Sequence, residues 1–103
     1  MRPALASVPA MARRSPVTIA IDAGTTGVRA LVVDEAAAVV DVAYRELTQH
    51  FPRPGWVEHD PTEIWATVQA TLAEVAGRLG AEQVVRAIGI TNQRETVVAW
   101  DRR

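Results

Sequence analysis

The chain contains neither cysteine nor lysine, and all eleven of its basic residues are arginine. Without cysteine, the sequence excludes a disulfide framework and a thiolate metal site. Without lysine, it cannot supply the lysine of a P-loop or of a Schiff base. If the chain binds nucleotide phosphates, it must therefore use other donors.

An excess of charge of one sign and long apolar runs are also lacking. The net charge is −1 and charged residues make up 22% of the sequence, which argues against a nucleic-acid-binding surface and against disorder. No apolar run is long enough to cross a bilayer, and residues 1–16 lack the continuous apolar core of a secretory signal. We therefore expect a soluble, cytoplasmic protein without nucleic-acid or membrane partners.

The 103 residues allow one small domain, and the 49% of apolar residues can build its core. Residues 1–16 have three arginines and no acid, and their alanines and prolines favour no packed element. We expect a disordered leader over residues 1–16 and a domain over residues 17–103. An organellar transit peptide is a weaker alternative, and Met11 rather than Met1 could be the true start.

Apolar and β-branched runs predict a mixed fold. Residues 17–21, 28–33 and 38–47 are expected to form strands of an antiparallel meander. Residues 84–90 are expected to form a central strand, which a helical crossover places parallel to an earlier strand. Residues 96–100 are expected to form a last short strand. The element order before that strand is β-β-β-α-β, in the α/β class.

The helix that precedes the fourth strand has a clear start. Asp60 is a good N-cap, Pro61 suits the first helical position, and Glu63 completes a pattern like a capping box. We expect the helix to end at Gly80. One face is apolar, and it consists of Ile64, Val68, Leu72, Val75 and Leu79.

The segment over residues 48–60 contains two prolines and a glycine, which favour a loop over a regular element. We expect Phe51 and Trp56 to anchor this loop, and Trp56 and Trp65 to pack as core aromatics. His59 is expected to have a structural role rather than a catalytic one.

Two polar segments are candidates for chemistry. The first, DAGTTGVR at residues 22–29, is a turn between strands in which glycines allow close approach of an anion. Backbone N–H groups and the hydroxyls of Thr25 and Thr26 can donate to phosphate, Arg29 can add a positive charge, and Asp22 can hold hydrated magnesium. A plain hairpin turn is the alternative interpretation.

The second segment, IGITNQRET at residues 88–96, follows a buried-strand pattern and ends in polar residues. Ligands of open α/β sheets gather beyond the carboxyl ends of parallel strands, which is where this polar part is expected. Glu95 can accept hydrogen bonds from vicinal hydroxyls, Arg94 can donate to them, and Gln93 can position the pair. An exposed ion pair of little energetic value is the alternative.

These two segments, with PGWVEHDPTEIW at residues 54–65 and the Trp100-Asp101 pair, resemble the FGGY family of carbohydrate kinases, and most closely its glycerol-phosphorylating branch. The resemblance covers residues 17–101. It implies an α/β, ribonuclease-H-like (actin-like ATPase) fold, of which this chain is an N-terminal domain fragment. It also implies ATP and Mg²⁺ as cofactors and a small polyol or sugar as substrate.

By this resemblance, contact with a polyol substrate is carried onto Arg94 and Glu95. Two departures stand in the first segment, where Gly27 replaces a usual serine and Ala23 a usual glutamine. Magnesium would be held by Asp22 through water. The implied nucleotide-binding set is Asp22, Thr25, Thr26, Gly27 and Arg29.

The resemblance also implies that the general base of phosphoryl transfer lies beyond residue 103, so no catalytic residue is assigned within the chain. The complete enzyme would make sn-glycerol 3-phosphate and could form homo-oligomers, whereas the fragment alone is expected to be inactive. The alternatives are a fragment of another FGGY sugar kinase, such as a pentulose kinase, a non-catalytic actin-like binding module, or a truncated gene product.

Overall fold

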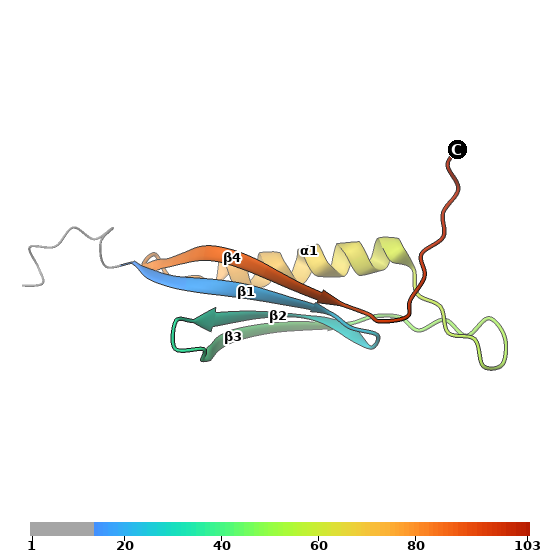
Figure 1. The fold of residues 1–103 in the computed structure, drawn as a ribbon, viewed down its shortest axis with the longest axis horizontal. Coiled ribbons are helices and arrows are strands. Elements are labelled where there is room, and N and C mark those ends of the chain that lie inside the picture. The colour runs from blue at the N-terminus through green and yellow to red at the C-terminus, as the bar shows by residue number, and fades with distance from the viewer. Residues whose placement is uncertain (1–13) are drawn as a thin grey trace, which may run out of the picture.

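A computed structural model describes residues 14–103, which form one mixed sheet with a helix on one face (Figure 1). The elements are β1 (Ser15–Ala23), β2 (Gly27–Asp34), β3 (Val39–Glu46), α1 (Pro61–Gly77) and β4 (Gln83–Asn92). The strand order in the sheet is β3-β2-β1-β4. The expected β-β-β-α-β order is thus confirmed. Within residues 14–103, no helix combines the length and apolar character needed to cross a membrane.

The pairing of the strands follows from the lengths of their connections. Short turns make β1 antiparallel to β2 and β2 antiparallel to β3. The crossover through α1 returns the chain so that β4 lies parallel to β1, with Ile19 opposite Ile88. β1 begins at Ser15, so Pro16 belongs to the strand and not to the expected leader. The rest of that leader, residues 1–13, lies outside the described residues.

The core lies between α1 and the face of the sheet that this helix covers. Alternate residues of β1 and β2 are buried there, because successive side chains of a strand point to opposite faces. The predicted apolar face of α1 packs on them, and α1 lies mainly against β2 and β3. The buried apolar residues are Val17, Ile19, Ile21, Ala23, Val28, Ala30, Val32, Ala43, Leu47 and Val75.

The prediction of a central β4 is wrong, because β4 is an edge strand within the described part of the chain. Ile88 and Ile90 lie opposite the buried Ile19 and Ile21 and therefore share their face of the sheet. However, α1 does not extend over β4, so both remain exposed, Ile90 at 73%. The apolar run thus identified a strand but not its neighbours.

Both ends of α1 differ in detail from the predictions. Asp60 is the N-cap and accepts a hydrogen bond from the Thr62 N–H at 2.8 Å, as expected. Glu63 does not complete a capping box, because its Oε1 accepts from the backbone N–H of Thr48 at 2.8 Å and so ties α1 to the segment after β3. The helix ends at Gly77, three residues before the predicted Gly80, and Arg78 caps it.

The predictions for the aromatic side chains and for the last strand are wrong. Trp65 is 62% exposed, and Phe51 and Trp56 are exposed as well. The segment between β3 and α1, which carries Phe51 and Trp56, extends beyond the end of the sheet (Figure 1), and the Arg53 guanidinium carbon lies 4.9 Å from the centre of the Trp56 ring. Residues 96–100 form no strand, and the chain after β4 leads away from the sheet instead of pairing with its edge (Figure 1).

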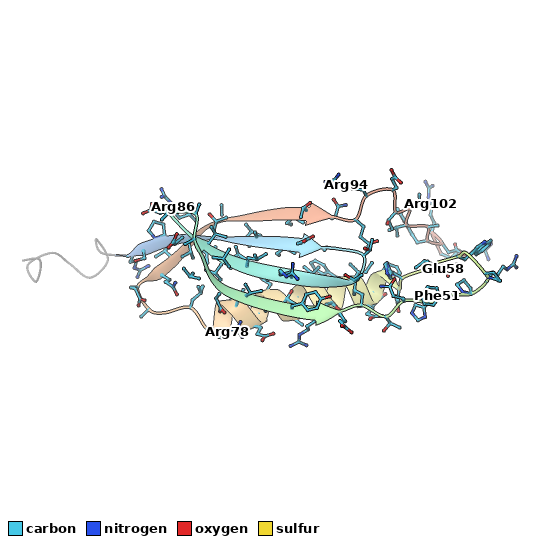
Figure 2. All side chains as sticks on the ribbon, turned by 90° about the horizontal axis from the view of Figure 1, so that it is seen from below. Phe51, Glu58, Arg78, Arg86, Arg94 and Arg102 are labelled. Atoms are coloured by element: carbon cyan, nitrogen blue, oxygen red, sulfur yellow. The ribbon has the colours of Figure 1, made fainter. Side chains whose placement is uncertain are left out.

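Arg78 joins the end of α1 to β3. Its Nε and Nη2 donate to the two carboxylate oxygens of Asp41 at 2.9 and 3.0 Å, and Nη2 also donates to the Val42 carbonyl oxygen at 2.9 Å. Its Nη1 donates to Oε1 of Glu74 at 2.9 Å. Figure 2 shows Arg78 at this end of the sheet. The hydrogen bonds from Arg78 to the Asp41 carboxylate lower the pKa of that group below its ordinary value.

A lowered pKa in the folded state makes the contribution of Asp41 to stability dependent on pH. The contribution is complete above the ordinary carboxyl pKa of about 4 and is lost as pH falls through the lowered value. We expect Asp41→Asn to have a lower melting temperature than the parent at pH 7, and a smaller difference at pH 3. Thermal unfolding followed by circular dichroism at both pH values measures this, and an equal difference at both would contradict it.

Candidate functional site

Three segments far apart in the sequence meet at one end of the sheet. They are the turn between β1 and β2, the start of α1, and the chain that follows β4 (Figure 1). Gly24 N–H donates to the Gly27 carbonyl oxygen at 3.0 Å and closes the turn. Because β1 and β4 are parallel, Ala23 and Asn92 lie opposite each other at their carboxyl ends. The structure therefore places both polar segments at the same end of the sheet.

The turn presents several hydrogen-bond donors to solvent. Thr25 and Thr26 are exposed, and no group within residues 14–103 accepts a hydrogen bond from their backbone N–H groups or their hydroxyls. The carbonyl oxygens of the turn are used instead: Thr26 accepts from Leu47 N–H at 3.0 Å, and Thr25 accepts from Gln49 Nε2 at 2.6 Å. A turn with its carbonyls engaged and its donors free fits a phosphate group.

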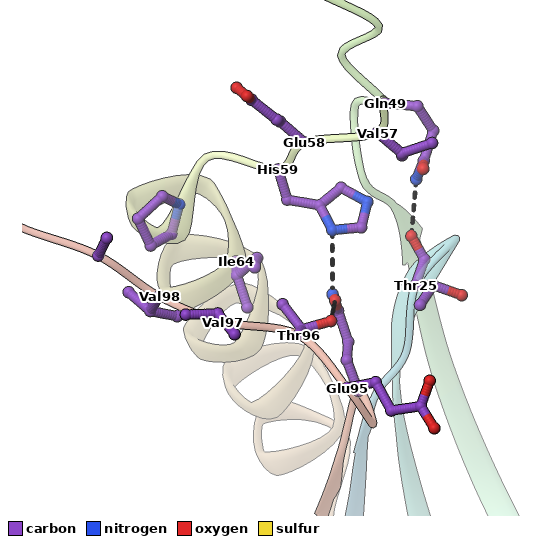
Figure 3. Close-up of a pocket in the computed structure, with 13 residues that line it drawn as sticks. Thr25, Gln49, Val57, Glu58, His59, Ile64, Glu95, Thr96, Val97 and Val98 are labelled. Carbon is purple, nitrogen blue, oxygen red and sulfur yellow. Dashed lines mark hydrogen bonds between the residues drawn. The ribbon is translucent and has the colours of Figure 1, made fainter. Parts of the chain in front are cut away.

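Gln93 connects the turn to the segment after β4. Its Nε2 donates to the Gly24 carbonyl oxygen at 3.0 Å and lies 3.2 Å from Nδ1 of His59, while its Oε1 accepts from the Thr96 hydroxyl at 2.8 Å. Figure 3 shows the contact with the His59 ring as a dashed line. Because Gln93 immediately precedes Arg94 and Glu95, it fixes the position of the second polar segment relative to the turn.

The same contacts determine the tautomer of His59. The Gly24 carbonyl can only accept, so the Gln93 side-chain nitrogen must face it and must also face Nδ1 of His59. Nδ1 is therefore an acceptor, and the proton of the neutral ring lies on Nε2. That Nε2 is buried and has no partner among the described residues. His59 thus contacts Gln93 and lies at the junction of the two segments, and its structural rather than catalytic role stays a prediction.

A cavity of about 710 Å³ lies between the turn, the start of α1 and the segment after β4 (Figure 3). Thr25, His59, Gln93 and Glu95 are among its lining residues. Glu95 has a φ of 59°, a left-handed conformation that costs a residue other than glycine about 1–3 kcal/mol. Arg94 is exposed at the end of β4 and does not line the cavity (Figure 2).

The remaining nucleotide candidates lie on the face of the sheet opposite α1. Asp22 and Arg29 are paired across β1 and β2, and both alternate with buried residues. The Arg29 guanidinium carbon lies 5.1 Å from the centre of the Tyr44 ring. Residues 14–103 contain no group of three or more His, Asp or Glu side chains that could hold a metal directly. The binding of magnesium to Asp22 through water stays a prediction.

Gly27 is enclosed more tightly than the rest of the turn. A Cβ atom there would lie 2.5 Å from the Tyr44 phenol oxygen and 2.6 Å from the Arg45 carbonyl oxygen. We expect Gly27→Ala to lower the free energy of unfolding by about 1–3 kcal/mol, because backbone atoms must move. Gly89, in β4, has open space around its Cβ position, so Gly89→Ala is the matched control and should not destabilise. Urea denaturation measures both, and equal effects would contradict this account.

The structure thus brings the turn and Glu95 to one cavity, and it places Asp22 and Arg29 beside the turn on the adjoining face. Their binding roles stay predictions. Gln49 and Thr96 were not among the predicted site residues, because each acts through a side-chain hydrogen bond that no sequence pattern reveals. Tyr44 was expected only as a strand residue, although the strand register places it opposite Arg29.

Residues 17–103 match the N-terminal domain of the FGGY family of carbohydrate kinases. A glycerol kinase of Carboxydothermus hydrogenoformans is 53% identical over 85 residues, which are 82% of this chain and 17% of that protein. Among solved structures, glycerol kinase of Plasmodium falciparum with ADP superposes with a TM-score of 0.77 at 34% identity, over 86% of this chain and 18% of the other. Xylulose kinase of Rhodospirillum rubrum superposes with a TM-score of 0.69 at 36% identity, over 74% of this chain and 16% of the other.

Proposed function

Because the chain belongs to the FGGY family of carbohydrate kinases, we propose that it supplies the nucleotide-phosphate turn and part of the polyol site of an ATP-dependent glycerol kinase. The chain spans about a sixth of the length of the relatives it matches. The whole reaction, which transfers a phosphoryl group from ATP to glycerol, is therefore assigned to the complete protein.

The observation that carries the proposal is the hydrogen bond from Gln93 Nε2 to the Gly24 carbonyl oxygen. It joins the turn suited to phosphate to the residues suited to a polyol. Phosphoryl transfer requires an attacking hydroxyl near the terminal phosphate and in line with the bond that breaks. A single amide that contacts both segments can hold the two ligands in fixed relative positions.

We assign the phosphate contacts to the free donors of the turn, namely the N–H groups and hydroxyls of Thr25 and Thr26. Arg29 adds positive charge beside them, and Gly27 closes the turn by accepting the Gly24 N–H at its carbonyl oxygen. Asp22 would hold the water shell of Mg²⁺, which neutralises phosphate charge when bound. Donors fixed before the reaction stabilise the charge of a transferring phosphoryl group without reorganisation.

Glycerol is assigned to the segment after β4. The Glu95 carboxylate would accept hydrogen bonds from its hydroxyls, and the Arg94 guanidinium would donate to them. Neither Asp22 nor Glu95 is proposed to remove the proton of the attacking hydroxyl. We assign that general base to sequence outside this chain, consistent with the longer relatives. Alone, the chain is expected to bind ligands weakly and to be inactive.

Glycerol is preferred over a pentulose as the substrate because of the 53% identity to a curated glycerol kinase. Because the chain is also similar to a xylulose kinase of known structure, xylulose is the pentulose to test as the alternative substrate. A cytoplasmic location, the absence of nucleic-acid or membrane partners, and a homo-oligomeric complete enzyme remain predictions.

The test is ATP-dependent phosphorylation by the protein expressed from its complete native reading frame, with glycerol and xylulose offered separately. We expect a higher kcat/KM for glycerol. A preference for xylulose would replace the substrate assignment, and activity on neither would contradict the proposal. The 103-residue chain is assayed in parallel and should show no turnover.

A non-catalytic binding module is the second candidate, and it makes a different prediction about stability. The exposed Ile88 and Ile90 should cause aggregation or partner-dependent folding of the 103-residue chain if it is part of a larger domain. A monomeric, cooperative unfolding transition of that chain, with no activity from the complete reading frame, would favour the module.

A further inference from the structure

Tyr44 lies beside the turn that we assign to nucleotide phosphates, although it belongs to a different strand. In β3 it pairs with Arg29, which pairs in turn with Asp22 across β1 and β2. Asp22 and Arg29 alternate with buried neighbours and so lie on the face of the sheet opposite α1, and the pairing with Arg29 places Tyr44 on that same face. Tyr44 is 44% exposed, and within residues 14–103 its hydroxyl has no hydrogen-bond partner.

The position of the Tyr44 ring is defined by Gly27. A Cβ atom on Gly27 would lie 2.5 Å from the phenol oxygen and 2.6 Å from Cε2 of the ring. The phenol oxygen therefore occupies the space in which a side chain of residue 27 would begin. The turn has no side chain at this position, and a hydroxyl from β3 lies there in its place.

The surroundings of this hydroxyl favour an anion. The Arg29 guanidinium carbon lies 5.1 Å from the centre of the Tyr44 ring, so a cation is held against the ring next to the turn. A phenol O–H can donate to a phosphate oxygen, and a hydrogen bond to a charged acceptor is stronger than one between neutral groups. The free N–H groups of Thr25 and Thr26 lie in the same turn.

We propose that Tyr44 is a further nucleotide-binding residue, whose Oη donates a hydrogen bond to a phosphate oxygen of ADP or ATP at the turn between β1 and β2. Its ring also holds the Arg29 guanidinium beside the turn. This inference rests on the proposed nucleotide-binding function and adds a residue from β3 to it. The alternative is that the ring only fills space above Gly27.

The test is Tyr44→Phe in the protein from its complete native reading frame, because this change removes the hydroxyl and keeps the ring, its contact with Gly27 and its contact with Arg29. Titration calorimetry measures the binding of ADP and of adenosine. We expect the Kd for ADP to rise roughly tenfold, as for loss of one hydrogen bond to a charged group. The Kd for adenosine, which has no phosphate, should not change.

Thr18→Val is the matched control, because Thr18 is an exposed hydroxyl residue on the same face of β1, near the end remote from the turn. It should leave the Kd for ADP unchanged. An unchanged Kd for ADP in Tyr44→Phe, or an equal rise for ADP and adenosine, would overturn the role of Tyr44 and leave the proposed function standing. Failure of the parent protein to bind ADP would overturn both.

Discussion

Glu95→Ala is expected to lower kcat/KM for glycerol by roughly 10²- to 10⁴-fold in the complete protein, because it removes a carboxylate that accepts about two hydrogen bonds from substrate hydroxyls. Steady-state kinetics at varied glycerol concentration measure the loss. Glu82→Ala is the control, since Glu82 is an exposed carboxylate that immediately precedes the first residue of β4, at the end of that strand remote from Glu95. A kcat/KM equal to that of the parent would remove Glu95 from the site.

The backbone of Glu95 allows this loss to be separated from misfolding. Its φ of 59° is a conformation that glycine adopts readily. Glu95→Gly should therefore lose activity as Glu95→Ala does, while its melting temperature is no lower than that of the alanine variant. If Glu95→Gly were much less stable than Glu95→Ala, the left-handed conformation would not be a constraint at this position.

Gln93→Leu should have the second large effect, on stability as well as on activity. Leucine cannot donate to the Gly24 carbonyl oxygen or to Nδ1 of His59, and it cannot accept from Thr96. The contacts with Gly24 and His59 are part-buried, and the loss of a hydrogen bond of this kind costs about 1 kcal/mol, so we expect the free energy of unfolding to fall by about 2 kcal/mol. Urea denaturation measures this loss.

A second readout tests whether Gln93 positions both ligand segments. We expect the KM values for ATP and for glycerol to rise together in Gln93→Leu. Thr96→Val is the matched control, because it keeps both contacts of Gln93 Nε2. It removes the 2.8 Å hydrogen bond to Oε1 of Gln93 and a 3.5 Å contact with the Arg94 carbonyl oxygen, and it should cost about 1 kcal/mol. A rise in KM for one substrate alone would contradict the role of Gln93 as a connection between the two segments.

The pattern of the sequence predicts most of the fold for physical reasons that are local. The β-branched runs locate the first three strands, and Asp60 with Pro61 locates the start of α1 to the residue. Its apolar face was also predicted, because a period of 3.6 residues identifies the buried side. Thr71 is an exception: it is fully buried, and its hydroxyl donates to the Thr67 carbonyl oxygen at 3.0 Å.

The wrong predictions concern features that depend on neighbours. An apolar run does not indicate whether a strand pairs with one neighbouring strand or with two. The run over residues 84–90 therefore led to the wrong prediction that β4 is a central strand. Trp65 is apolar and adjacent to the buried face of α1, yet its position on the helix directs it to solvent. The strand expected over residues 96–100 has the required composition but no partner within the described chain.

The candidate site was predictable in its residues but not in its connections. Thr25 and Glu95 were chosen for their chemistry, and the structure places both on one cavity. The contact between Gln93 and His59 joins residues 34 positions apart, and no periodicity encodes such a pair. The relation between Tyr44 and Gly27 likewise depends on strand register, which the sequence constrains only to the choice of face.

The most direct measurement is a crystal structure of the protein from its complete native reading frame with ADP, Mg²⁺ and glycerol. We expect ADP phosphate oxygens to lie against the N–H groups of Thr25 and Thr26, and glycerol hydroxyls to lie against the Glu95 carboxylate. Gln93 should still donate to the Gly24 carbonyl oxygen between the two ligands. Nucleotide phosphates bound away from this turn, or glycerol bound away from Glu95, would contradict the account.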